Sequence, residues 1–487
     1  MKKQKSIKLN FVMNSILTMS SFIFPLVTFP YISRILLPEG TGRVNFATSF
    51  IAYFTMFAQL GIPTYGIRAC AAVRDDRDKL SRTAQELLII NLTMSALSYI
   101  VLFVLLFTVP RLFEDRLLYI IVSSNILLTA IGMEWLYKAL EQYTYITVRS
   151  IIFKFIALIG MFILVHEQKD YVIYGGITIF AGCASNVMNF VNVHKYIDLK
   201  FLGGYNFRPH LKAVGIFFAM ACATTVYTHL DTVMLKFMAT DIDVGYYGAA
   251  TKIKTILVSI VTSLGTVLLP RASYYVKQKK MEEFYCITEK ALNFVFLIAT
   301  PLTIYFMIFA RSGVLFLSGG EYEGAVVPMQ IIMPTLLLIG ITNILGIQIL
   351  VPLGKEKYVL YSEIAGAVTD VVLNALLIPS MKSSGAAIGT LVAEFVVLIV
   401  QYVILRDMVK PAFLKIRYGK IMLAVAVGAG AASCTLLLHW GHFTILMISS
   451  VIFFGLYGLL MLVMKESLVI ELMQQVMNKF HLTKKDS

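Results

Sequence analysis

The stretch Ile151–Val165, which reads IIFKFIALIGMFILV, decides the fold class. It shows none of the alternation between apolar and polar residues that the strands of a membrane barrel require. Apolar blocks of this kind recur along the chain at about 20 residues, the length at which a helix rising about 1.5 Å per residue crosses ~30 Å of hydrocarbon. The sequence therefore predicts an all-α integral membrane protein.

The composition agrees with lipid as the main solvent. Of the 487 residues 58% are hydrophobic and 14% are charged, and the mean hydropathy is +0.78, whereas soluble domains carry about 25% charged residues. The net charge of +14 is assigned to membrane topology, and we expect no nucleic-acid partner. The five cysteines are scattered without a CxxC pair, so neither a disulfide framework nor a metal site is predicted.

The polar breaks divide the chain into fourteen predicted spans. They begin near residues 10, 44, 84, 117, 150, 172, 212, 244, 287, 325, 359, 385, 419 and 444. An even number of spans puts both termini on one side of the membrane. Basic residues gather in alternate loops, for example at Arg74 and Arg77 after the second span and at Lys410 and Lys415 after the twelfth. Because basic loops stay inside, both termini are predicted to be cytoplasmic.

An internal repeat organises these spans. Gly42 and Gly245 each begin a G-x-x-x-x-A-T pattern, after the first and the seventh span. The pattern predicts an N-terminal lobe at 1–211 with spans one to six and a C-terminal lobe at 212–418 with spans seven to twelve. Two appended spans follow at 419–465, and then a cytoplasmic amphipathic tail at 466–487. Two six-helix lobes around a central cavity are typical of alternating-access transporters.

Charged residues inside spans are the first candidates for a site, because each costs at least about 2.5–3.5 kcal/mol to insert at the membrane centre. Lys252 lies roughly 12 Å below the outer end of span eight, and Lys254 follows it. One interpretation is a cationic cavity wall that attracts an anionic headgroup such as phosphate. The alternative is a structural pairing of these lysines with Asp370 or Glu394.

Three buried acids are candidates for coupling-ion sites. Asp370 and Glu394 lie mid-span in spans eleven and twelve, and Asp231 lies late in span seven near His229. Carboxylates between membrane helices commonly carry protons or sodium ions. The alternatives are an ion pair with the lysines for the first two and a helix-packing hydrogen bond for Asp231.

The outer loops argue against an enzyme. They are short, whereas a polysaccharide polymerase would need exposed loops that hold its acceptor and its catalytic carboxylates. The chain contains no Walker motif, and Asp241-Ile-Asp243 is too short a pattern to indicate a glycosyltransferase. We expect no catalytic residue and no cofactor.

Three segments resemble a known family. They are PYISRILLPEG at Pro30–Gly40, QLGIPTYGIR at Gln59–Arg68, and the block from Asp231 to Ala250. Together they resemble the Wzx-type O-antigen and capsular polysaccharide repeat-unit flippases of the multidrug/oligosaccharidyl-lipid/polysaccharide exporter superfamily. The resemblance covers nearly the whole chain, since that family also shows fourteen spans in a six-plus-six-plus-two arrangement.

The resemblance implies a substrate and a site. The substrate would be an oligosaccharide repeat unit on undecaprenyl pyrophosphate, moved from the inner to the outer leaflet of a bacterial cytoplasmic membrane. A polysaccharide polymerase would be a partner, and H⁺ or Na⁺ would be the coupling ion. Family cavities use basic residues from both lobes. The positions in this sequence that fit are Arg34, Arg68, Lys236, Lys252 and Lys254.

Other transporters of the superfamily are the alternatives. A multidrug or cation antiporter would share the two lobes, but it would favour an acidic or aromatic cavity over lysines. Lipid II flippases and teichuronic acid exporters are nearer alternatives, distinguished by the lipid that accumulates when the gene is lost. A membrane polysaccharide polymerase is the alternative from a different class.

Overall fold

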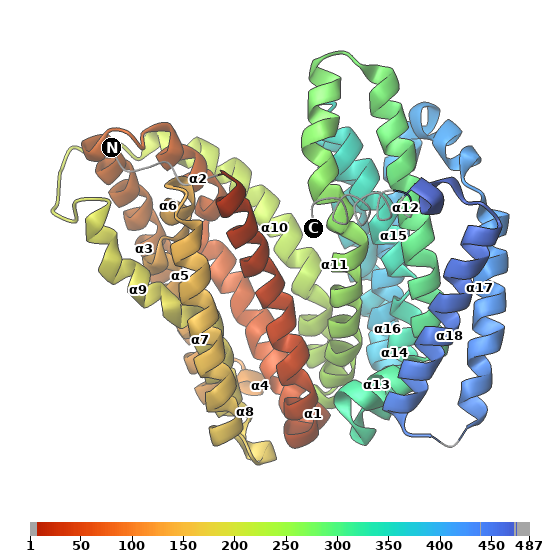
Figure 1. The fold of residues 1–487 in the computed structure, drawn as a ribbon. Coiled ribbons are helices and arrows are strands. Elements are labelled where there is room, and N and C mark those ends of the chain that lie inside the picture. Colours follow the sequence, from red (N-terminus) through yellow and green to blue (C-terminus); the bar gives the residue numbers. More distant parts are fainter. Residues whose placement is uncertain (1–6, 439, 472–473, 475–487) are drawn as a thin grey trace, which may run out of the picture. The chain divides into compact units, whose positions relative to one another are not determined.

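The computed structural model describes residues 7–438, 440–471 and 474, and every regular element within them is a helix (Figure 1). This confirms the all-α fold expected from the uninterrupted apolar blocks. The chain divides by its internal packing into two compact units, residues 1–248 and 249–487. The predicted lobes at 1–211 and 212–418 stay a prediction.

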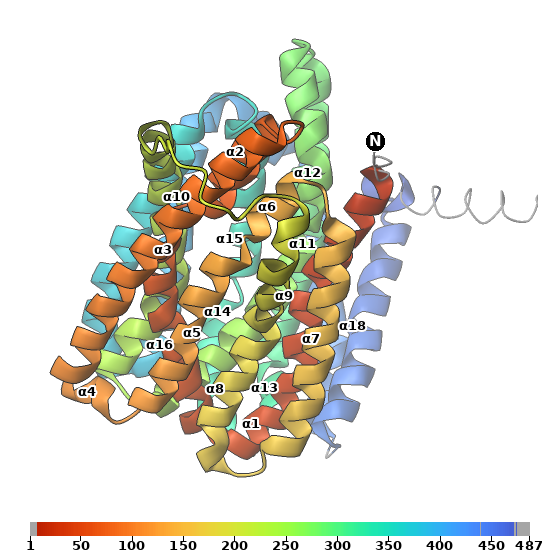
Figure 2. The same cartoon turned by 90° about the vertical axis from the view of Figure 1, so that its left-hand side faces the viewer.

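Unit 1 consists of ten complete helices, three short 3₁₀ or π segments and the beginning of an eleventh helix. The α-helices are α1 (Ile7–Gln59), α2 (Ile62–Ala72), α3 (Arg77–Thr108), α4 (Pro110–Phe113), α5 (Arg116–Gly132), α6 (Glu134–Ala139), α7 (Tyr143–Leu164), α8 (Tyr171–Ile179), α9 (Ser185–Asn192), α10 (Arg208–Met238) and α11 (Asp241–Lys277). The shorter segments are η1 (Gln168–Asp170), η2 (Phe180–Ala184) and η3 (Val193–Lys195). Helix α1 packs against α3, α5, α7 and α10, and Figure 2 shows α7 beside it.

Unit 2 contains the remainder of α11 and seven further α-helices. These are α12 (Met281–Ile308), α13 (Ala310–Ser318), α14 (Val326–Ile332), α15 (Thr335–Thr342), α16 (Glu356–Lys415), α17 (Tyr418–Ser433) and α18 (His442–Val463), with η4 (Gly320–Ala325), η5 (Asn343–Leu350) and η6 (Cys434–Leu437). The predicted amphipathic tail, 466–487, lies for the most part outside the described residues.

Ten helical stretches of the described residues are long and apolar enough to cross a membrane, or eleven if the bent pair Gly320–Ile332 and Thr335–Leu350 is one span. The expected count of fourteen is therefore not confirmed. Two of the ten contain a helix long enough for two crossings of about 20 residues each, because α1 has 53 residues and α16 has 60. Each changes direction at a residue with a positive φ, Leu37 in α1 and Lys382 in α16.

The turn inside α1 has a local cause. Leu37 precedes Pro38, and the proline ring disfavours the helical conformation of the residue before it. Leu37 has φ 58° and ψ 178°, so the helix is interrupted there and resumes with Pro38.

The two parts of α16 pack closely on each other. An ideal Cβ on Gly385 would lie 2.7 Å from the carbonyl carbon and oxygen of Leu377, so only a residue without a side chain allows this approach. The small residues of Gly385–Gly389 thus allow close helix packing, as small residues do in membrane proteins.

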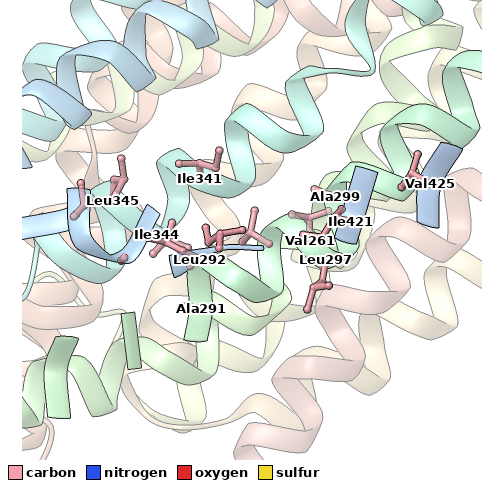
Figure 3. Close-up of a cluster of buried hydrophobic side chains, with 14 of the residues drawn as sticks. Val261, Ala291, Leu292, Leu297, Ala299, Ile341, Ile344, Leu345, Ile421 and Val425 are labelled. Atoms are coloured by element: carbon pink, nitrogen blue, oxygen red, sulfur yellow. The ribbon is translucent and has the colours of Figure 1, made fainter. Parts of the chain in front are cut away.

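The core of unit 2 is a continuous cluster of aliphatic side chains. Figure 3 shows Val261 of α11, Leu292 of α12, Ile341 of α15, Ile344 of η5 and Ile421 of α17 meeting in this cluster. Their exposed fractions are all 3% or less. Because lipid tails are as apolar as these side chains, the helices are held by close packing rather than by exclusion of water.

Candidate functional site

A network of charged side chains joins five elements of unit 1. At its centre, the Arg43 guanidinium on α1 lies 2.9 Å from Asp115, 2.8 Å from Glu39 and 3.8 Å from Asp241. Asp115, just before α5, also accepts a hydrogen bond of 2.9 Å from the hydroxyl of Tyr171 on α8. The Asp115 side chain is only 1% exposed. This carboxylate needs cationic partners, since an unpaired buried charge is costly.

Lys236 is the second cation of this network. Its ammonium nitrogen, at the end of α10, lies 2.5 Å from Asp241 and 3.9 Å from Asp115. It also lies 5.6 Å from the centre of the Phe46 ring, within cation–π range. This predicted substrate-binding residue is therefore buried and paired with carboxylates in the structure described.

The two copies of the predicted repeat meet beside this network. An ideal Cβ on Gly42 would lie 1.8 Å from the carbonyl oxygen of Asp241, and one on Gly245 would lie 2.0 Å from the carbonyl oxygen of Pro38. The contacts are reciprocal, because Pro38 and Asp241 are separated by the same 203 positions as Gly42 and Gly245 (241 − 38 and 245 − 42). The second half of α1 and the start of α11 therefore cross at backbone contact.

The other predicted basic residues are placed differently. Arg34 is exposed on the first half of α1, where its guanidinium donates a hydrogen bond to the carbonyl oxygen of Pro30. Arg68 is exposed on α2. Lys252 and Lys254 are half-buried on α11 and belong to unit 2. Of the five, only Lys236 is thus part of the Arg43 network.

The predicted ion-coupling acids are all buried, with exposed fractions of 5% for Asp231, 2% for Asp370 and 5% for Glu394. Asp231 accepts a hydrogen bond from the hydroxyl of Tyr247, which links α10 to α11 and matches the helix-packing alternative. An ideal Cβ on Gly389 would lie 3.0 Å from Asp370 Oδ1, so the two parts of α16 approach closely at this acid. A coupling role for these residues stays a prediction.

Lys154, a lysine in the middle of α7, is not among the site residues predicted from the sequence. Its ammonium donates hydrogen bonds of 2.9 Å to the hydroxyl of Ser20 and 3.0 Å to that of Ser21, both on α1. The signal was available, since Lys154 interrupts the apolar stretch Ile151–Val165 and satisfies the same rule for intramembrane charges that selected Lys252.

Comparison with known proteins identifies the family. A family profile described as "Polysaccharide biosynthesis protein" matches residues 7–276, more than half of the chain. The chain belongs to this family. The matched segment includes the Arg43 network, the crossing of α1 with α11 and all five predicted basic residues. A second profile, MatE, matches residues 216–376.

Two curated proteins, each named "Putative O-antigen transporter", are similar to this chain over most of its length. The one from Escherichia coli (strain K12) is 24% identical over 394 residues, which cover 80% of this chain and 95% of the relative. The one from Shigella dysenteriae is 26% identical over 394 residues, with coverage of 78% and 95%.

A solved structure has the same fold. It is titled "Lipid II flippase MurJ, inward closed conformation" and superimposes with a TM-score of 0.71, covering 92% of this chain and 98% of the other at 16% identity. Together with the family profiles and the curated relatives, it confirms the resemblance to Wzx-type flippases of the exporter superfamily that the sequence segments indicated.

Proposed function

We propose that this protein is a flippase that moves oligosaccharide repeat units on undecaprenyl pyrophosphate from the inner to the outer leaflet of a bacterial cytoplasmic membrane. The observation that carries the proposal is the similarity to two proteins named as O-antigen transporters over 95% of their length. The apolar helices and the fold of a lipid-linked-precursor flippase support it.

The basic residues supply the chemistry for binding. A pyrophosphate group carries negative charge and several acceptor oxygens, and ammonium and guanidinium groups are its usual partners. Arg34, Arg68, Lys252 and Lys254 are proposed to bind it. Lys236 joins them in a state in which its contacts with Asp241 and Asp115 are released.

Energy for directional transport is proposed to come from H⁺ or Na⁺ bound at Asp370, Glu394 or Asp231. Their burial supports this role, since an ion can compensate a carboxylate that water does not reach. The protein acts as a transporter rather than an enzyme, with both termini in the cytoplasm, and it delivers its product to a polysaccharide polymerase on the outer face.

Gene deletion with complementation tests the proposal. Polyprenyl-linked saccharides are extracted from the deletion strain and from strains complemented with the wild-type protein or Lys252→Ala, with assays for exposure on each leaflet. The deletion should accumulate complete repeat units that face inward. Lys252→Ala should lower translocation about tenfold, the cost of one lost contact to a charged group at ~1.5 kcal/mol.

Lys277→Ala is the matched control, because Lys277 is an exposed lysine at the end of the same helix α11. It should translocate as the wild type does. If repeat units accumulate facing inward in the deletion strain while Lys252→Ala restores full transport, the flippase function is supported and a role for Lys252 in binding is contradicted. Normal surface polysaccharide without any accumulated intermediate would reject the flippase, and export of drugs or cations would become the leading function.

A further inference from the structure

Lys154 lies at mid-depth in the membrane. It is eleven residues from the start of α7 at Tyr143 and ten from its end at Leu164, or about 16 Å and 15 Å along the helix axis. Its partners Ser20 and Ser21 also lie near the middle of the first part of α1, which runs from Ile7 to the turn at Leu37. The ammonium is therefore held near the centre of a hydrocarbon layer about 30 Å thick.

Two neutral hydroxyl groups hold this charge directly, and the carboxylate of Glu134 attracts it from beyond ion-pair distance. The ammonium has three N–H donors, and the hydroxyl oxygens of Ser20 and Ser21 accept two of them. Both hydroxyls donate their own hydrogens to the carbonyl oxygen of Leu17. No carboxylate among the described residues forms an ion pair with Lys154. A methionine would fill this space without the insertion cost of a charge, so the lysine indicates a site for an anion.

An apolar groove runs beside the ammonium. It has a volume of about 400 Å³ between α1 and α7, and its lining surface is entirely apolar, because Ser20 and Lys154 contribute only carbon atoms to it. On α1 it extends from Ile16 to Val27, eleven residues or roughly 16 Å along the membrane normal. Met19, Ile23 and Phe155 line it with exposed fractions of 59%, 52% and 61%, so the groove is accessible from the surface of unit 1.

The apolar groove and the adjacent ammonium group together indicate a ligand that has both a hydrocarbon chain and an anionic group. A hydrocarbon chain fits the apolar walls, and a phosphate fits the ammonium with its remaining N–H donor. The headgroups of ordinary two-chain lipids stay at the membrane surface, about 15 Å from this depth. An anionic headgroup reaches mid-depth only while it crosses the membrane.

We propose that the groove between α1 and α7 holds the isoprenoid chain of a polyprenyl-phosphate lipid, and that Lys154, positioned by Ser20 and Ser21, binds its phosphate during translocation. The proposal rests on the proposed function and deepens it, because it gives the lipid carrier a further contact in unit 1. It concerns the carrier alone and is independent of the sugar.

Binding of the bare carrier tests this site. Radiolabelled undecaprenyl phosphate is titrated against the full-length protein in nanodiscs, with undecaprenol as the uncharged analogue and phosphatidylglycerol as a two-chain anionic competitor. Lys154→Met should weaken binding of undecaprenyl phosphate about tenfold or more and leave that of undecaprenol within about twofold. Lys154→Arg should retain binding of both, because it keeps the charge. Ile23→Trp, which fills the groove away from the ammonium, should weaken both.

Three results would overturn the site. The first is undiminished binding of undecaprenyl phosphate to Lys154→Met, with thermal unfolding in detergent showing that the variant is folded. The second is equal weakening of undecaprenyl phosphate and undecaprenol by Lys154→Met. The third is competition by phosphatidylglycerol as strong as that by undecaprenyl phosphate, which would indicate a general surface for anionic lipids.

The leaflet assay separates this proposal from the flippase itself. If binding of undecaprenyl phosphate depends on Lys154 but the deletion strain accumulates no saccharide, the lipid-binding site is supported and the flippase function is contradicted. If the deletion strain accumulates inward-facing repeat units but Lys154→Met restores full transport, the flippase function is supported and the Lys154 site is contradicted.

Discussion

Asp115 shows at the scale of a single residue how charge is tolerated inside unit 1. Its carboxylate is almost fully buried, and it is shared by Arg43, Lys236 and Tyr171. The sequence predicted Lys236 as a binding residue, but in the structure it is paired with Asp241, five residues further on, and with Asp115, which lies just before α5. Asp115 is far from Lys236 in the chain, so no spacing rule could pair these two.

Asp115→Asn should destabilise the protein by about 3 kcal/mol, because it leaves the half-buried Arg43 and the buried Lys236 with one carboxylate fewer. Thermal unfolding in detergent measures the effect. The matched control is Glu323→Gln, which breaks the exposed pair between Arg311 and Glu323 and should cost less than about 1 kcal/mol. Equal effects of the two variants would show that the Arg43 network does not hold unit 1 together.

The crossing of α1 and α11 shows how two helices are brought to backbone contact. The G-x-x-x-x-A-T pattern predicted that the two segments are related, but it did not predict that they touch. In the structure each glycine receives a backbone carbonyl of the other segment. The predicted repeat explains this reciprocity, since two equivalent segments that meet around an approximate two-fold axis exchange the same contact.

Gly42→Ala and Gly245→Ala should have equal effects. Each would place a methyl group within about 2 Å of a backbone oxygen that has no freedom to rotate away, so the helices must separate. We expect each variant to lower stability by about 2 kcal/mol and to reduce translocation in the leaflet assay. Gly215→Ala on α10 is the control, because an ideal Cβ there meets no atom within 4 Å. Unequal effects of the two variants would contradict the reciprocal arrangement.

The whole molecule is a chain of helices in two compact units, and its orientation in the membrane is a prediction from charge. A fluorescent protein fused after Ser487 should fluoresce, because that reporter folds in the cytoplasm. Alkaline phosphatase inserted at Gly441, between α17 and α18, should be active, because it needs the outer compartment. A C-terminal fusion without fluorescence, together with an inactive insertion at Gly441, would show that the chain has the opposite orientation in the membrane. The leaflet assay on the deletion strain complemented with each fusion checks that the reporters leave transport intact.

The sequence by itself determined that the protein lies in a membrane, which fold class it has and which family it resembles. All three follow from local composition and from short segments that can be interpreted one at a time. Blocks of apolar residues predicted membrane helices, and motifs such as PYISRILLPEG carried the family resemblance. Only the tertiary structure decided which charges meet. Lys236 lies with Asp115 and Asp241, and Lys154 lies with Ser20 and Ser21. The physical reason is that the cost of a buried charge depends on atoms from other helices within a few ångströms, and the order of residues along one helix does not contain them.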